Sequence, residues 1–464
     1  MNKIHRDALA GSDVRLECVL DSYDLLPNEW VNEIYGLTPY RGQLFFQNQS
    51  GVQYAFNPRT KALTVEATGF SGSGMLIFKD KLYVGSTDMS NHAPRIDERD
   101  KNGVWAKRCE GTPGDYWIQS FGVFGDDAYA SCKTKILKSS DGVTWTLDHT
   151  VVKTITVFHT IGSNLYAFEG EPDTAPYTPS RIYKKTAGVW SLVKTCADVK
   201  FFICETGKWS NCVLGGLSYV GGYEGKLYRW DETKLVTFLE TPQSWLNLIP
   251  AIFPQVGVSR VGAHLFFAVS SGSGEIAQGK FYCWDGLQLL KLLELPFNLL
   301  PPIYFDGRLY FTAHTPAMGG AVTQFDRSLK WGEQNKGFIL SLPWDIIQQG
   351  KIEPRVVRVW VDKAATATLT YNSDDDLGVV IPCFGYKTKT IYAKDTTAAT
   401  LTVQADMDGT NTWEDFPILG VIDHSLSANV MKRLYTDEGA AFLRLKVVQG
   451  AADGILNVRV VLEP

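Results

Sequence analysis

The sequence lacks several signatures that would assign a function directly. None of its eight cysteines forms a Cys-x-x-Cys pair, which excludes the common tetrahedral zinc motifs. No run of 18 apolar residues occurs, so we expect no membrane span, and residues 1–17 lack the apolar core of a secretory signal. A basic excess is missing too, because 45 Lys and Arg stand against 50 Asp and Glu. We therefore expect no readout of nucleic-acid sequence.

Catalytic constellations are also missing. The seven histidines are not spaced for a metal site on one element, and none adjoins a G-x-S-x-G motif. The two SGSG runs, 71–74 and 271–274, lack the Lys-Ser/Thr of a phosphate-binding loop. From these absences we predict a protein that is not an enzyme and that needs no cofactor. The scattered cysteines indicate reduced, buried thiols of a protein made in a reducing cytosol.

The chain does contain a repeat of about 44 residues. In each copy a turn rich in Gly or Asp is followed by Leu, an aromatic residue and one or two apolar or small residues. Several copies continue into a hairpin, as in 136–147 and 181–193. Short strands at this period are typical of the blades of a β-propeller. The key positions of the repeat are Leu44, Leu82, Ala128, Leu165, Leu217, Leu265 and Leu309.

These patterns predict an all-β protein in two parts. Residues 32–340 form a β-propeller of about seven blades, with six blades as the alternative. Residues 1–31 are an N-terminal extension whose strand-like segment 14–20 is suited to closing the ring, because an open ring would leave a free sheet edge. In residues 341–464 the repeat stops and period-2 alternation begins, which predicts a small β-sandwich or jelly roll.

The sharpest local motif is an S-x-D-G-x-T-W turn made of Ser139, Asp141, Gly142, Thr144 and Trp145. The Asp carboxylate and Ser hydroxyl can accept hydrogen bonds from the turn, Gly permits positive φ, and the Trp packs between blades. The string is similar to the Asp box of sialidase-like propellers, a resemblance that implies a structural turn distant from any catalytic centre. Residues 186–190 resemble a degraded second copy.

Two weaker candidate sites lie elsewhere. Asp406, Asp408 and Asn411 place oxygen ligands at nearly alternate positions, as in a calcium loop, although a solvated turn is the favoured interpretation and we expect no metal. Four aromatic residues in expected inter-strand loops are candidates for stacking on a glycan, with core packing favoured for each. These four are Tyr116, Trp117, Tyr223 and Trp245.

The whole-chain organisation resembles virion structural proteins of tailed bacteriophages. The resemblance rests on the turn at 139–145 within a loosely repeating propeller, and on the strand–turn–strand texture of 397–416 followed by 431–448. Nozzle proteins of short-tailed phages are of similar size and architecture. The resemblance implies a non-enzymatic tail component, either nozzle, tail tip or fibre-associated, which assembles in the host bacterial cytoplasm and resides in the virion.

Two main classes of function follow, with a cellular propeller scaffold that binds a peptide as a weaker third. The first is this structural role, whose partners are further copies of the chain in a ring or fibre, neighbouring virion proteins and, at host attachment, a cell-surface glycan. The alternative is a glycan-directed Asp-box propeller, either a lectin-like receptor binder or a sialidase-like glycoside hydrolase. Against the hydrolase, residues 93–97 and 179–183 are the nearest strings to the sialidase arginine motif, and neither matches it.

Overall fold

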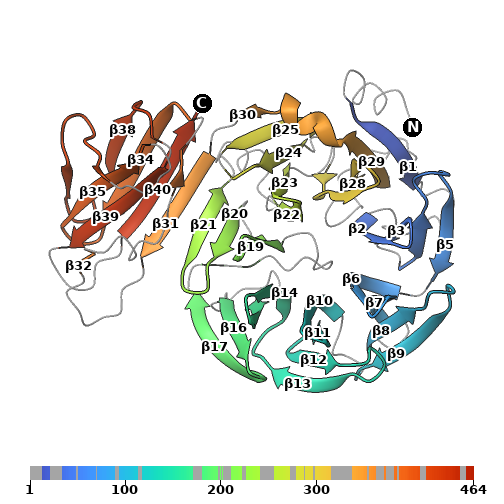
Figure 1. The fold of residues 1–464 in the computed structure, drawn as a ribbon. Coiled ribbons are helices and arrows are strands. Elements are labelled where there is room, and N and C mark those ends of the chain that lie inside the picture. Colours follow the sequence, from blue (N-terminus) through green and yellow to red (C-terminus); the bar gives the residue numbers. More distant parts are fainter. Residues whose placement is uncertain are drawn as a thin grey trace, which may run out of the picture. The chain divides into compact units, whose positions relative to one another are not determined.

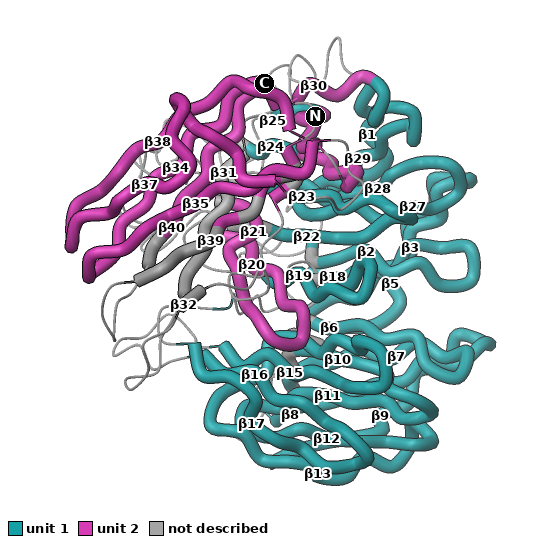
Figure 2. Tube along the Cα trace, turned by 60° about the vertical axis from the view of Figure 1, so that its left-hand side comes forward, with its two compact units in different colours: residues 1–225, 244–281, 293–348 teal, residues 226–243, 282–292, 349–464 magenta. Residues whose placement is uncertain are grey.

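The protein is built almost entirely of antiparallel β-strands. The helical structure within the described residues is one short 3-10 turn, η5 (Trp344–Gln349). Two compact units are present, one made of residues 1–225, 244–281 and 293–348, the other of residues 226–243, 282–292 and 349–464 (Figure 2). The computed structural model describes residues 13–20, 34–48, 51–68, 70–88, 93–112, 118–170, 180–196, 199, 201, 211–221, 226–240, 255–271, 278–286, 288–295, 298–314, 337–352, 355–361, 370–371, 381–383, 386–407, 414–440, 442–449 and 456–464.

The first unit contains four consecutive four-stranded sheets, which we call blades 1 to 4 (Figure 1). Blade 1 consists of β2 (Ile34–Tyr40), β3 (Gln43–Asn48), β4 (Gln53–Phe56) and β5 (Leu63–Ala67). Blade 2 consists of β6 (Phe70–Phe78), β7 (Lys81–Asp88), β8 (Ala93–Arg99) and β9 (Trp105–Glu110). Blade 3 consists of β10 (Ile118–Phe124), β11 (Asp127–Cys132), β12 (Lys135–Ser139) and β13 (Thr146–Thr150). Blade 4 consists of β14 (Ile155–Ile161), β15 (Asn164–Glu169), β16 (Ser180–Thr186) and β17 (Val189–Cys196).

Two further groups of four strands follow in the chain, and the first hairpin of each lies in the first unit. These hairpins are β18 (Asn211–Leu214) with β19 (Leu217–Gly221), and β22 (Gln255–Val261) with β23 (His264–Ser271). The remaining strands are β20 (Lys226–Trp230), β21 (Leu235–Glu240), β24 (Gln278–Trp284) and β25 (Leu289–Leu295). A last group, blade 7, contains β26 (Asn298–Leu299), β27 (Ile303–Phe305), β28 (Arg308–His314) and β29 (Gly337–Pro343).

The inner strands of the first unit give the number of blades. In order, β2, β6, β10, β14, β18, β22 and β27 each lie beside the next, and β27 lies beside β2 again. This closed cycle has seven members, so the described residues form a seven-bladed propeller and the six-bladed alternative is not needed.

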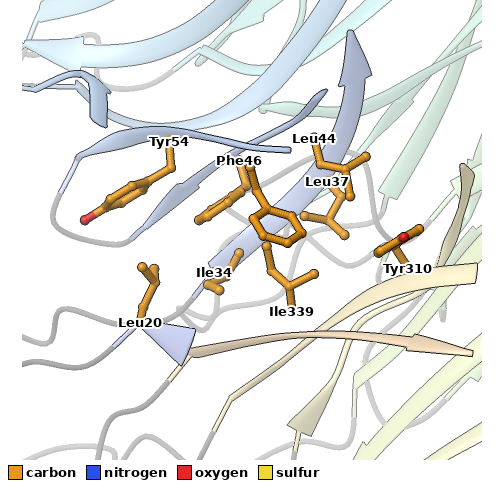
Figure 3. Close-up of a cluster of buried hydrophobic side chains, with 9 residues drawn as sticks. Leu20, Ile34, Leu37, Leu44, Phe46, Tyr54, Tyr310 and Ile339 are labelled. Carbon is orange, nitrogen blue, oxygen red and sulfur yellow. The ribbon is translucent and has the colours of Figure 1, made fainter. Parts of the chain in front are cut away.

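An N-terminal strand completes blade 7. Strand β1 (Arg15–Leu20) pairs antiparallel with β29, and Leu20 on β1 packs with Ile34 of β2 and Ile339 of β29 in one buried cluster (Figure 3). Ser341 on β29 donates a hydrogen bond of 2.5 Å to Glu17 on β1. The ring is thus closed by a strand from the beginning of the chain, and its last strand, β29, runs past residue 340 to Pro343.

The Leu-aromatic repeat lies on the second strand of each group of four, except in blade 7, where Leu309 lies on β28. Leu44, Leu82 and Leu165 are fully buried. In each case one residue stands between the Leu and the two-residue turn before it. The copy at Leu217 is the exception. Gly215 and Gly216 form that turn, so Leu217 opens β19 opposite Leu214, and Ser218 takes the buried position. The predicted key position is therefore wrong by one residue in this blade, because the copy has one residue fewer between turn and Leu.

The second unit contains two antiparallel sheets. The first has the order β20-β21-β31-β40-β34-β38, and it includes β20 and β21 because β21 pairs with β31 at Thr237 and Arg358. The second is built on β39 and β35, flanked by β32, β33, β36 and β37, while β30 pairs with β25. Face-to-face packing of these sheets as a sandwich stays a prediction. The bounds are β30 (Lys351–Ile352), β31 (Arg355–Val361), β32 (Thr370–Tyr371), β33 (Ile381–Pro382), β34 (Thr388–Asp395), β35 (Ala399–Asp406), β36 (Glu414–Asp415), β37 (Asp423–Leu426), β38 (Lys432–Thr436), β39 (Phe442–Gln449) and β40 (Leu456–Glu463).

Candidate functional site

The S-x-D-G-x-T-W motif forms the turn between β12 and β13. Oδ1 of Asp141 accepts hydrogen bonds of 2.8 Å from the backbone N–H groups of both Val143 and Thr144. The Ser139 hydroxyl accepts from the N–H of Gly142 at 2.8 Å and donates to Asp141 at 3.0 Å. These bonds, first those from the backbone of Thr144 and Val143, lower the pKa of Asp141 to about 2.

Gly142 brings this turn against blade 2. Its φ is +75°, which favours glycine, and a Cβ there would lie 2.0 Å from the hydroxyl oxygen of Tyr83. The neighbouring Ser140 carbonyl accepts a 2.6 Å hydrogen bond from Nζ of Lys79. The motif therefore fixes two side chains of blade 2 as well as its own turn.

Trp145 packs at the junction of blades 2 and 3. Its half-buried ring lies edge-on to Tyr83 and Phe121, with centroid distances of 6.4 and 6.1 Å. Trp190 in the degraded copy contacts Tyr129 in the same manner, at 6.3 Å, across the junction of blades 3 and 4. The structure thus repeats one aromatic contact at two successive junctions.

A β-bulge recurs between the third and fourth strands of blades 1 to 4. The unpaired residue of each bulge is Glu66, Arg108, Asp148 or Val193. Glu66 bonds Arg99 of blade 2 at 2.8 Å, and Asp148 accepts from Lys185 of blade 4 at 2.5 Å. The bulge thus turns a charged side chain toward the next blade at these two junctions.

Blade 2 breaks this pattern. Its bulge residue is Arg108, and the position of blade 3 that corresponds in register to Arg99 and Lys185 is Ser139. Arg108 therefore meets no carboxylate there, and it binds Glu98 of its own blade through Nε at 3.1 Å and Nη2 at 3.0 Å.

Glu98 is the centre of a buried charge cluster. Its side chain is only 2% exposed, and it also accepts hydrogen bonds from Lys81 at 2.8 Å and from the Tyr83 hydroxyl at 3.1 Å. Burial alone would raise the pKa of Glu98, but the bonds from Arg108, Lys81 and Tyr83 outweigh burial and hold it below its usual range. Burial and the nearby Glu98 carboxylate raise the pKa of Tyr83. Glu98 is therefore an anion, and Tyr83 a neutral donor to it, at neutral pH.

A cleft of about 330 Å³ opens above this cluster. It lies between the turn at 79–80, which joins β6 to β7, and the turn at 100–104, which joins β8 to β9. Its charged lining consists of Lys79, Lys81, Lys101, Arg108, Asp80, Glu98 and Asp100. We call it the blade-2 cleft. Because Asp80 is paired with Arg41 outside this lining, positive charge prevails in the cleft.

Of the predicted calcium and glycan residues, Asp406 alone is among the residues that the structure describes, and it does not line this cleft. Asp406 ends β35 with its side chain buried, whereas Asp408 and Asn411 lie outside the described residues. The part of the chain that the structure describes contains no group of three His, Cys, Asp or Glu that could hold a metal ion. All four aromatic glycan candidates, Tyr116, Trp117, Tyr223 and Trp245, also lie outside the described residues. No helix within the described ranges has the length and apolar character to cross a membrane.

Comparisons with known proteins support the fold. No family model and no curated protein matches the chain. Among solved structures, the β-propeller domain of the Trilobed protease from Pyrococcus furiosus is 10% identical with a TM-score of 0.42, over 62% of this chain and 91% of that domain. The tricorn protease is 9% identical with a TM-score of 0.41, over 70% of this chain and 35% of its own. A putative gluconolactonase is 14% identical with a TM-score of 0.37, over 56% of this chain and 90% of its own.

These comparisons correct one expectation. Two of the similar structures are named for enzymes and one is a domain of an enzyme, so the prediction that the chain is not an enzyme is wrong as a conclusion from missing motifs. At 9–14% identity they assign no activity to this chain. None of the three is named as a phage tail protein, and the role in a phage tail stays a prediction.

Proposed function

We propose that this protein is a structural component of a bacteriophage tail, where it assembles with further copies of itself and with neighbouring virion proteins. The proposal rests on the sequence resemblance to virion proteins and on the combination of a closed propeller with a second β unit. The virion is its proposed location, after assembly in the host cytoplasm. A stable assembly of this kind buries more than about 1,000 Å² at each contact.

The observation that best supports assembly is an exposed apolar turn on the second unit. Ile418 and Val421 pair with each other, and between them Leu419 is 84% exposed at a φ of +54°. A left-handed backbone is unfavourable for Leu, and so is a large apolar side chain in water. Val421 and Ile422 beside it are also exposed. Burial of this turn against a neighbouring subunit would offset both costs.

The mass of the purified chain in solution tests the proposal. Sedimentation equilibrium should give a multiple of the 51.6 kDa chain mass, and negative-stain images should show rings or fibres of identical subunits. Leu419→Asp should shift the equilibrium toward the monomer. Val65→Asp is the matched control, because Val65 is an exposed apolar residue (57%) on the propeller. A monodisperse monomer at micromolar concentration would overturn the proposal.

A further inference from the structure

We propose that the blade-2 cleft binds a sugar acid, a small molecule that carries one carboxylate and several hydroxyl groups. The inference does not depend on the proposed role in a phage tail, because it rests on the side chains of one blade. The volume of about 330 Å³ is at the lower end of the range for small-molecule sites, which fits a ligand of this size.

Arg108 and Lys81 are positioned by Glu98 and keep further N–H donors that can bind an anion. Arg108 donates to Glu98 through Nε and Nη2, so the N–H groups of its Nη1 can donate to a ligand carboxylate. Lys81 gives one of its three donors to the same carboxylate and is 34% exposed. The buried Glu98 thus fixes both cations without neutralising the pair. Exposed Lys101 adds a third positive charge at the rim.

The rest of the lining suits hydroxyl groups and carbon-bound hydrogens. Asp100 uses Oδ1 to accept from the backbone N–H groups of Asn102 and Val104, and its carboxylate also faces the cleft. Carboxylate oxygens at such a position accept hydrogen bonds from ligand hydroxyls. Val104 and Ala106 supply an apolar wall. A bare inorganic anion would use the cations and leave this wall and the acceptors unused.

The cleft is not a requirement of the propeller. At the junction of blades 1 and 2 and at that of blades 3 and 4, the bulge residue bonds the next blade, through Glu66 and Arg99 and through Asp148 and Lys185. Blade 2 alone among blades 1 to 3 carries a cation at the bulge, and the cleft lies on that blade. The same fold could be built with the usual bridge, so the departure points to a ligand.

Titration calorimetry of the full chain with glucuronate, at low salt, tests this site. Glucuronate should bind, whereas glucose, which lacks the carboxylate, should not. Acetate and sulfate should each bind at least about ten-fold more weakly, because they cannot use the hydroxyl acceptors and the apolar wall. Absence of glucuronate binding at millimolar concentration would overturn the proposal. Equal affinity for sulfate and glucuronate would also overturn it, because the cleft would then accept any oxyanion.

Two substitutions with opposite expected signs sharpen the test. Lys101→Gln should weaken glucuronate binding about five-fold, since it removes a rim cation that binds nothing else in the cleft. Glu98→Gln should instead tighten binding by about ten-fold, because it removes the buried negative charge and keeps an acceptor for Arg108 and Lys81. Lys107→Gln, an exposed lysine on β9 paired with Glu110, is the control and should leave the affinity unchanged. Weaker binding by a Glu98→Gln variant with an unchanged melting temperature would refute the assigned role of the cations.

Discussion

Two neighbouring junctions of the propeller use the same aromatic contact and opposite arrangements of charge. Between blades 2 and 3, Trp145 meets Tyr83; between blades 3 and 4, Trp190 meets Tyr129 at nearly the same distance. At the second junction Asp148 binds both Lys185 and the Trp190 indole N–H, which joins the blades through buried charge. At the first, Arg108 binds Glu98 of its own blade, and the residues that line the blade-2 cleft all belong to that blade. The two junctions therefore share an aromatic contact and differ in charge: an ion pair closes the junction of blades 3 and 4, whereas Arg108 and Ser139 form none at the equivalent positions of blades 2 and 3.

The largest effect should come from the glycine of the first junction. Gly142→Ala should lower the free energy of unfolding by about 4 kcal/mol, because it adds left-handed strain and a Cβ that displaces the buried Tyr83. Gly188 occupies the corresponding turn of blade 4 at a φ of +86° with open space around it. Gly188→Ala should therefore cost about 1 kcal/mol, from backbone strain alone. Urea unfolding of both variants measures the difference, and equal losses would contradict the contact with Tyr83.

Replacement of either tryptophan should have the next largest effect on stability. Trp190→Ala should cost about 3 kcal/mol and Trp145→Ala about 2 kcal/mol, values at or below the lower end of the range for fully buried aromatics because both side chains are half-buried. The Trp190 substitution should lower stability more because the Trp190 indole N–H donates to the Asp148 carboxylate at 2.6 Å, and that carboxylate would lose one donor. Chemical denaturation gives both values, and the reverse order would show that the buried charge contributes nothing at the closed junction.

Replacement of Lys185, which bonds Asp148 of the preceding blade, should have a smaller effect on stability. Lys185→Met should lower the free energy of unfolding by about 2 kcal/mol, because the side chain is 4% exposed and its loss leaves Asp148 with less compensation. Lys138 provides a comparison, since it pairs with Asp127 at 2.8 Å while both side chains are partly exposed. Lys138→Met should change stability by less than about 0.5 kcal/mol.

The smallest effect concerns the pH dependence of the turn at Asp141. Its pKa of about 2 lies below the unfolded value of about 3.9, so the ionised carboxylate stabilises the folded state above pH 4. That stabilisation should be lost as the pH falls from about 4 to 2. Wild type should therefore melt at a higher temperature than Asp141→Asn at pH 7, and the gap should shrink over that interval. A gap independent of pH would mean that the charge of Asp141 is irrelevant to the turn.

The sequence was sufficient to predict the fold class and the repeat, because both depend on local patterns. Buried Leu44 and Leu82 follow a two-residue turn, and turn residues and alternation are visible in one dimension. The offset at Leu217 shows where a local pattern fails. Leu217 follows its turn directly, with no residue between them, so the buried position falls on Ser218. The sequence also did not predict that a strand of one propeller group pairs with a strand more than a hundred residues later. The pairing of β21 with β31, which places residues 226–243 in the second unit, has no local signal.

The cleft could not be predicted, and the reason is geometric. Glu98 and Arg108 are ten residues apart on adjacent strands, and their meeting depends on a bulge whose unpaired residue no sequence pattern marks. Charge does alternate at the bulge positions Glu66, Arg108 and Asp148, but these positions become equivalent only once the strand pairing is known.

The pairing of β1 with β29 has a consequence for how the chain folds. Glu17 and Ser341, which meet in the closing sheet, are 324 residues apart, so joining them in an unfolded chain would cost on the order of 5 kcal/mol in loop entropy. Blades 1 to 4 are each made from consecutive strands and need no such contact to form. During synthesis they can therefore form while β1 still waits for its partner. Strand β1 precedes blades 1 to 4 in the chain and would still be paired after them, and until β29 is made its edge is open to any other strand, including the β29 of another copy.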